Sequence, residues 1–304
     1  SDPTLSTTTY RQLESSHPIP DETSLAAGEV LLNFLDELPE GEPLLFLLSG
    51  GASALAEVLP GEMTAEQLGE LNQRLLSSGL SISEMNAQRK QLSQIKGGKL
   101  IPYLKGRACL QLLLSDVPGD DVSVIGSGPL IGEANNIESH IVASNDRARD
   151  AVLTEAVKKG ITVNNNPGHF QGDAEELAAQ FSDELLNGPA GLYLWGGESS
   201  VVLPEAPGRG GRNQHLALAA ARYLVGHENV LLLAAGTDGS DGPTEDTGAL
   251  VDGGTVQRGE WEGLNALDAL QAADSGTFLE ASGDLIQTGP TGTNVMDLVI
   301  AWKW

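Results

Sequence analysis

Short apolar runs alternate along the chain with longer segments of helical periodicity, and this alternation restricts the fold more than any other feature. Five runs of four or five residues are almost wholly apolar and have the length of strands. Such continuous runs are typical of strands buried on both faces, as in parallel sheets with crossover helices. The pattern predicts an α/β fold with mostly parallel sheets and helices on both faces. The runs are residues 44–48, 110–114, 192–195, 230–233 and 298–301.

Several of the intervening segments begin with a residue that caps helices, such as Asp21 or Asp173. A Gly-, Asn- and Pro-rich stretch of weak periodicity, residues 126–139, divides the chain, whose 304 residues suffice for two domains. We therefore expect an N-terminal α/β domain at residues 1–133 and a C-terminal α/β domain at residues 139–304. The predicted helices are residues 24–37, 64–77, 83–95, 146–159, 173–186 and 213–224.

The charge of the chain excludes some partners. Lys and Arg number 17 against 42 Asp and Glu, which gives a net charge of −25. A surface this acidic repels phosphate backbones and anionic lipid, so neither nucleic acid nor a membrane is an expected partner. One cysteine, Cys109, within an apolar run excludes an intrachain disulfide and fits a cytoplasmic protein. If the substrates are anions, clustered cations mark where they bind.

Glycine-rich loops follow the predicted strands, where ligands of open α/β sheets bind. In the loop Ser49-Gly50-Gly51-Ala52-Ser53, paired glycines let backbone N–H groups approach a phosphate or carboxylate, although a tight turn explains the loop equally well. The chain has neither the GK[ST] ending of a Walker A loop nor a GxGxxG dinucleotide loop. A P-loop or nicotinamide site therefore has little support.

Two clusters of cations are candidate anion sites. Residues 89–99 hold Arg89, Lys90, Lys96 and Lys99, although a solvated basic helix face is the commoner meaning of such a run. In the segment GRGGRNQ at residues 208–214, glycines flank two arginines at the start of a predicted helix. Guanidinium groups beside helix N–H donors suit a nucleotide γ-phosphate, and we find no packing reason for arginines among these glycines.

Carboxylates in two loops suit Mg²⁺ or the proton of a substrate hydroxyl, namely Asp116 in one loop and Asp238 and Asp241 in another. Turn chemistry alone also explains these residues. The loop at residues 236–249 does not have the spacing of an EF-hand, and the five histidines stand outside HExxH and GxSxG motifs. The sequence therefore gives no support to a zinc protease or a serine hydrolase. Asn294, in the glycine-rich loop before the last predicted strand, adds an amide group as a further candidate.

Eight segments, taken in order, resemble the glycerate 2-kinase family, whose C-terminal part is the MOFRL domain. The resemblance implies two α/β domains with a ligand cleft between them, and phosphorylation of D-glycerate to 2-phosphoglycerate with ATP and Mg²⁺. The segments are SHPIPDETSLAAG, LSGGASAL, NAQRKQLSQIKGGKL, LSDVPGDDVSVIGSGP, WGGES, GRGGRNQHLAL, AAGTDGSDGPTEDTGA and TGPTGTNVMDLVI.

On this basis we expect three kinds of site residue. The catalytic residues would be Arg212, Asp238 and Asp241, and the metal ligands Asp116 and Asp238. The residues expected to bind substrate or phosphate are Ser49, Gly50, Gly51, Ser53, Arg89, Lys96, Arg209, Asn213 and Asn294.

The sequence also departs from the family pattern. Family members usually begin with a further α/β segment whose Gly-Lys-Ala-type loop carries a lysine regarded as catalytic, and this sequence starts after it. We expect that residues are omitted from the sequence, because a sheet without its first strand would expose an apolar edge. Reduction of hydroxypyruvate and ligand binding without catalysis remain alternatives. The oligomeric state also stays open, with a homodimer as one candidate.

Overall fold

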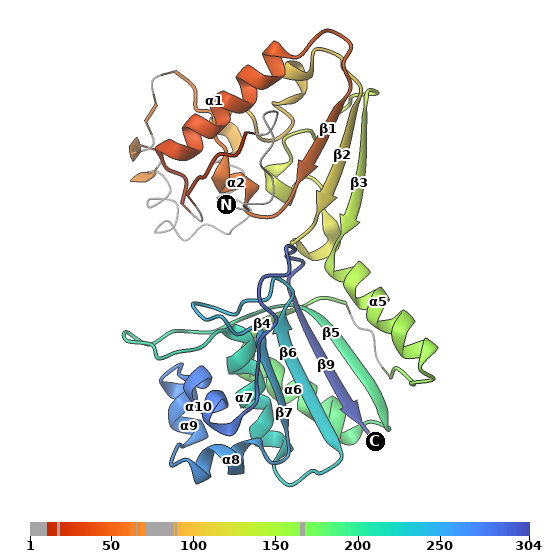
Figure 1. Ribbon diagram of the computed structural model, residues 1–304, viewed down its shortest axis with the longest axis vertical. Helices are drawn as coiled ribbons and strands as arrows, with labels where there is room; N and C mark the ends of the chain where they lie inside the picture. The colour runs from red at the N-terminus through yellow and green to blue at the C-terminus, as the bar shows by residue number, and fades with distance from the viewer. Residues whose placement is uncertain are drawn as a thin grey trace. The chain divides into compact units, whose positions relative to one another are not determined.

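A computed structural model describes residues 11–16, 19–61, 63–64, 66–67, 69–70, 88, 90–164 and 168–304. The chain divides into two compact units (Figure 1). The first comprises Ser1–Ser115 and Asp120–Val142, and the second comprises Asp116–Gly119 and Ala143–Trp304. None of the helices in these described ranges is long and apolar enough to cross a membrane.

The first unit is built on a three-stranded sheet with the order β1-β2-β3. Strands β1 and β2 are parallel, with Leu44 opposite Cys109. Helix α1 begins after Asp21, whose carboxylate accepts the N–H groups of Thr23 and Ser24, while the Ser24 hydroxyl accepts the N–H of Asp21. The elements are α1 (Glu22–Glu37), β1 (Leu44–Leu48), α2 (Ala52–Leu55), β2 (Cys109–Leu114), β3 (Ile137–Ala143) and the 3₁₀ turns Ile101–Leu104 and Ile125–Ser127. A third 3₁₀ turn, Pro118–Asp120, includes residues of both units.

One face of this sheet carries the core of the unit. Leu35 of α1 packs there with Leu100 and Leu104, and all three are almost fully buried. On the opposite face Leu45 and Leu47 are 56% and 67% exposed. In the described part of this unit, therefore, helices do not cover both faces as the sequence predicted.

The second unit has a six-stranded sheet with the order β4-β5-β9-β6-β7-β8. Its strands are β4 (Phe170–Asp173), β5 (Gly191–Ser200), β6 (Val230–Gly236), β7 (Gly248–Asp252), β8 (Leu285–Ile286) and β9 (Asp297–Lys303). Its helices are α5 (Asn145–Lys158), α6 (Ala174–Asn187), α7 (Arg212–Leu224), α8 (Thr255–Trp261), α9 (Ala266–Gln271) and α10 (Ser275–Ser282).

The strand directions of this second sheet correct part of the prediction. Strands β4 and β5 are parallel, but the four pairings from β5 to β8 are antiparallel. The C-terminal strand β9 lies between β5 and β6 and runs against both. The α/β class and the two-part organisation are confirmed, whereas the second sheet is mixed and not mostly parallel. An apolar run shows that a strand is buried and carries no information about its direction.

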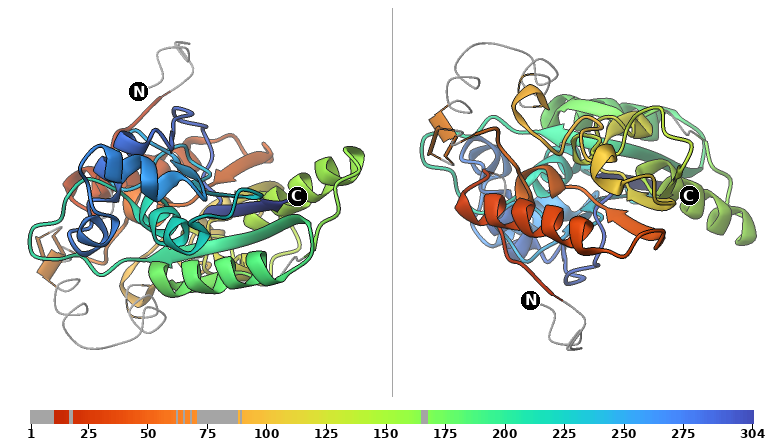
Figure 2. Two further views of the ribbon diagram at one scale, coloured as in Figure 1. Left: turned by 90° about the horizontal axis from the view of Figure 1, so that it is seen from below. Right: turned by 90° about the horizontal axis from the view of Figure 1, so that it is seen from above.

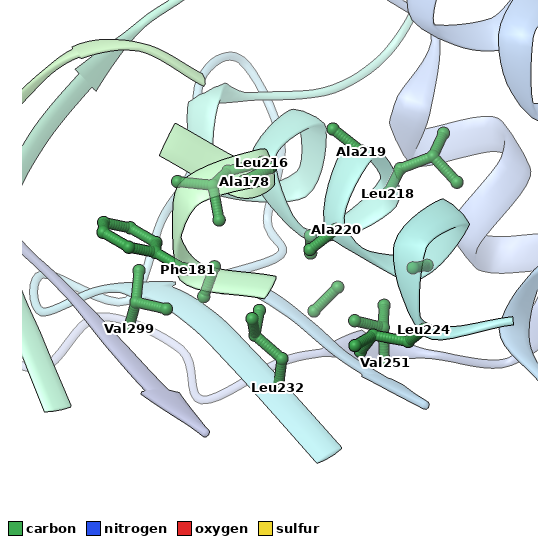
Figure 3. Packing of buried hydrophobic residues seen from close by; sticks show 14 of the residues in the cluster. Ala178, Phe181, Leu216, Leu218, Ala219, Ala220, Leu224, Leu232, Val251 and Val299 are labelled. Atoms are coloured by element: carbon green, nitrogen blue, oxygen red, sulfur yellow. The ribbon is translucent and has the colours of Figure 1, made fainter. Parts of the chain in front are cut away.

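The large core of the second unit lies between this sheet and the helices α6 and α7 (Figure 3). Phe181 of α6 stacks on Trp195 of β5, with ring centroids 4.5 Å apart. Alanines such as Ala220, which is fully buried, allow α7 to lie close to the strands.

Helix α5 packs on the other face of β5. A side chain at Gly196 would collide with Asn145 and Arg149 of α5, whereas its neighbour Trp195 points to α6. Successive residues of a strand point to opposite faces, so the sheet is covered on both faces at β5. Figures 1 and 2 show α5 and the group α8–α10 at opposite sides of this unit.

The structure contains all five predicted strands and places helices at four of the six predicted positions. The predicted helices at residues 64–77 and 83–95 lie mostly outside the described residues. Strands β3, β4, β7 and β8 and the helices α8–α10 were not predicted. Because β3 joins the first sheet, the division between the units lies after Val142, later than the predicted boundary.

Phe181→Ala should lower the free energy of unfolding by about 3–5 kcal/mol, because it leaves a cavity between two aromatic rings. Phe181 is 1% exposed and contacts both Phe170 and Trp195. Urea denaturation followed by circular dichroism measures the change. As a control, Trp261→Ala removes a side chain that is 73% exposed and should shift stability by no more than about 0.5 kcal/mol.

Candidate functional site

A buried carboxylate organises the start of α7. Asp241, which is 4% exposed, comes from the loop after β6. Its Oδ1 accepts the backbone N–H of Asn213 at 3.0 Å, and its Oδ2 accepts that of Gln214 at 2.8 Å. The cap residue Gly211 has no side chain to do this, and a Cβ there would collide with Asp241. Asp241 therefore caps α7 from a distant part of the chain.

Arg212, the first residue of α7, carries a half-exposed guanidinium group. It forms an ion pair with Glu198 of β5 and lies 3.5 Å from Oδ2 of Asp297. The side chain of Arg212 is 41% exposed, and that of Glu198 is 48% exposed. This guanidinium group is thus held by carboxylates and still open to an anion from solvent.

Asp297 begins β9 and is 3% exposed. It lies opposite Gly197 of β5 and Gly236 of β6, which have no side chains to crowd it. Burial raises the pKa of Asp297 to about 7, although the charge of Arg212 acts to lower it. The amide of Asn145 donates to the carbonyl of Asp297 at 3.0 Å and so holds the start of the strand.

Arg209 has a structural role that the sequence did not reveal. Its guanidinium group pairs with Asp246, which is fully buried, at 2.7 Å and with Glu280 at 2.5 Å. Its backbone N–H donates to Asp274. The expectation that both arginines of GRGGRNQ lack a packing role is therefore wrong for Arg209, and phosphate binding by this residue stays a prediction.

The residues of the first unit that were predicted to bind anions lie in several separate contacts. Lys96 is buried and forms an ion pair with Glu57, which also accepts a hydrogen bond from Ser93. Ser53 forms a hydroxyl–hydroxyl hydrogen bond of 2.8 Å with Ser127. Gly51 has a φ of 77°, a left-handed conformation that favours glycine, directly before α2. Ser49 and Gly50 precede it in the same loop, and Arg89 lies outside the described residues.

The remaining predicted residues lie in the second unit. Oδ1 of Asp238 accepts the N–H of Ser240 at 2.9 Å, and Oδ1 of Asn294 accepts that of Met296 at 3.0 Å. Asp116 also belongs to this unit. Throughout the described residues, no group of three or more His, Cys, Asp or Glu side chains is arranged to hold a metal ion. Asp116 and Asp238 are therefore not part of such a group.

Three residues of the site were missed by sequence reasoning. One is Asp297, the first residue of β9. The others are Asn145 of α5, which binds the carbonyl of Asp297, and Glu198 of β5, which pairs with Arg212 at the start of α7. A weak signal existed, since Asp297 and Glu198 lie within the motifs TNVMD and WGGES. Their roles depend on strand pairing, which the sequence did not reveal.

Fold and site together define an α/β protein with a half-exposed arginine at the start of a helix. A family model described as "Domain of unknown function (DUF4147)" matches residues 2–161, and the MOFRL family model matches residues 191–297. The chain is 36% identical to the D-glycerate 2-kinase of Thermotoga maritima, over 94% of this chain and 78% of that protein. It is 32% identical to the glycerate 2-kinase of Pyrococcus horikoshii, over 95% and 77%.

A solved structure agrees with these matches. The crystal structure of the glycerate kinase from Thermotoga maritima superposes with a TM-score of 0.89 and 34% identity, covering 96% of this chain and 80% of that one. The chain belongs to the glycerate 2-kinase family, as its eight motifs suggested.

Asp241→Ala should destabilise the protein by about 1–2 kcal/mol, because it removes the cap of α7 and leaves two N–H groups without an acceptor. Thermal unfolding followed by circular dichroism measures the loss. The matched control is Asp238→Ala in the same loop, where one hydrogen bond to Ser240 is removed and a smaller loss is expected. Equal losses in the two variants would contradict the capping role.

The difference in stability between Asp297→Asn and the unaltered protein should change with pH in a defined direction. The folded protein keeps the proton of Asp297 up to pH about 7, whereas the unfolded chain releases it near the ordinary value of 3.8. This group's contribution to stability is therefore lost as pH rises between these values. Asparagine does not titrate, so the variant should gain stability relative to the unaltered protein from pH about 5 to pH about 8. Melting temperatures of both proteins across this pH range test the prediction. A difference in melting temperature that does not change with pH would contradict it.

Proposed function

We propose that the protein is an ATP-dependent kinase that phosphorylates D-glycerate at its 2-hydroxyl group. Membership of the glycerate 2-kinase family supports this activity. The structural observation that supports it best is the half-exposed Arg212, held at the start of α7 between two carboxylates. A cation placed in this way can stabilise the charge of a transferring phosphoryl group.

Each site residue then has a proposed task. Arg212 contacts the γ-phosphate, and the amide of Asn213 adds a polar contact beside it. In the first unit, the loop with Gly51 offers N–H groups to a phosphate or to the glycerate carboxylate. Its further members are Ser49, Gly50 and Ser53.

Mg²⁺ is proposed only as the companion of ATP, where it would neutralise part of the phosphate charge. The described residues contain no group of three metal-ligating side chains, so we propose no protein ligands for this ion. The role of Asp241 changes as well. Both of its oxygen atoms accept N–H groups of α7, so we propose that it supports Arg212 through the helix and does not contact the substrate.

The alternative of hydroxypyruvate reduction has weaker support, because the chain has no GxGxxG loop for a nicotinamide cofactor. An assay of ATP-dependent consumption of D-glycerate, run beside NADH oxidation with hydroxypyruvate, separates the two activities. Binding of ATP and D-glycerate without turnover would instead identify a ligand-binding relative.

Arg212→Ala should lower kcat for glycerate phosphorylation by about 10²- to 10³-fold, the usual effect of losing one group that stabilises the transition state. The control is Arg222→Ala in the last turn of the same helix, where the guanidinium lies 3.9 Å from Glu175. Arg222→Ala should keep the kinetics of the unaltered protein. An unchanged kcat in Arg212→Ala would remove this residue from the mechanism.

A further inference from the structure

Two buried acceptor atoms at the start of α7 have no donor. Oδ2 of Asp297 and Oδ1 of Asn213 are both without a hydrogen-bond partner among the described residues. Asp297 is 3% exposed and Asn213 is 1% exposed. Buried polar atoms without a partner are costly and uncommon in folded proteins, and they are often associated with function. This place therefore suits a donor group from a ligand, such as a hydroxyl.

The neighbouring carboxylate of Asp241 differs, because both of its oxygen atoms already have donors. Asp241 accepts one backbone N–H at each oxygen atom, so its carboxylate is committed to the helix. Arg212 does not satisfy Asp297 either, because its nitrogen lies 3.5 Å from Oδ2, beyond ordinary hydrogen-bond length. Of the two buried aspartates, Asp297 is the one with an acceptor to spare.

An exposed ion pair lies beside Asp297, because Arg212 is 3.5 Å from its Oδ2. The guanidinium group of Arg212 is held by Glu198, which is 48% exposed. The phosphate or carboxylate of an anionic ligand competes with Glu198 for this guanidinium group. A ligand that binds Arg212 in this way brings its own hydroxyl next to Asp297.

We propose, on the basis of the kinase function above, that Asp297 is the catalytic residue that accepts the proton of the substrate hydroxyl. The hydroxyl oxygen forms a bond to the γ-phosphorus of ATP, and the bond from that phosphorus to the β,γ-bridging oxygen breaks. The hydroxyl proton moves to Oδ2 of Asp297, and ADP leaves with the bridging oxygen and its electron pair. Asp297 then returns the proton to water.

The surroundings of Asp297 support this role. Arg212 and Asn213 from α7 lower its pKa, whereas Glu198 from β5 and Asp241 from the loop after β6 raise it. Burial has the largest effect and brings the pKa to about 7. A proton acceptor works best when its pKa lies near the working pH. Since the carboxylate is the active form, kcat should rise with pH through about 7.

The test compares Asp297→Asn with the matched variant Asp284→Asn. Asp284 is also a buried carboxylate beside an arginine, with Oδ1 bound to Arg258 at 2.6 Å and Oδ2 without a partner among the described residues. It follows α10 and has no place in the proposed mechanism. ATP-dependent phosphorylation of D-glycerate is measured from pH about 5 to pH about 9 for both variants and the unaltered protein.

Asp297→Asn should lower kcat by about 10²-fold or more, with KM for D-glycerate within about threefold, and the rate that remains should no longer rise through pH 7. Asp284→Asn should keep the kcat and the pH profile of the unaltered protein. Retained turnover with an unchanged profile in Asp297→Asn overturns the role of Asp297 and leaves the kinase function intact. The absence of turnover in the unaltered protein overturns the kinase function, and the inference with it.

If Asp297→Asn does not fold, the unaltered protein carries the test. Its kcat should then show one ionisation near pH 7. A kcat that is constant across this range overturns the proposal. Asp297→Glu supplies a second variant, in which a pH-dependent kcat should survive at a lower level.

Discussion

The capping of α7 by Asp241 is the interaction on which the rest of the site depends. The carboxylate occupies the first free N–H groups of the helix, which are the usual anion-binding groups of an α/β protein. At the start of α7, an incoming phosphate must therefore be bound by a side chain, and Arg212 is the cation at that position. The cap also fixes the first turn of α7, so it determines where Arg212 and Asn213 lie.

In this strongly acidic chain, several cations have a structural role as partners of buried carboxylates. Lys96 neutralises Glu57, Arg209 neutralises Asp246, and Arg258 neutralises Asp284. A buried carboxylate without such a partner is expensive, because burial removes its hydration. Two of the residues predicted to bind anions, Lys96 and Arg209, already have carboxylate partners in the structure. Arg212 is about as exposed as Arg209, at 41% against 39%, but its buried partner Asp297 lies 3.5 Å away, whereas Asp246 lies 2.7 Å from Arg209.

The strongest parts of the fold prediction rest on the apolar runs. Strands β1, β2, β5, β6 and β9 each contain a run of mostly apolar residues and were all predicted from the sequence. Strand β3, with the sequence IESHIVA, was missed because its polar residues are exposed and interrupt the apolar pattern. Strand β8 has two residues, which is too short for any periodicity to be read.

The sequence by itself determined the α/β class, the family and the residue types from which a site for anions can be made. These depend on local periodicity and on motifs, which a linear sequence contains. The tertiary structure alone decided that Asp241 caps a helix while Asp297 keeps an acceptor free. That difference arises because α7 presents its N–H groups to Asp241, whereas β9 buries Asp297 between Gly197 and Gly236. The partners of a carboxylate are set by the elements packed around it, and strand order brings those elements together from distant parts of the chain.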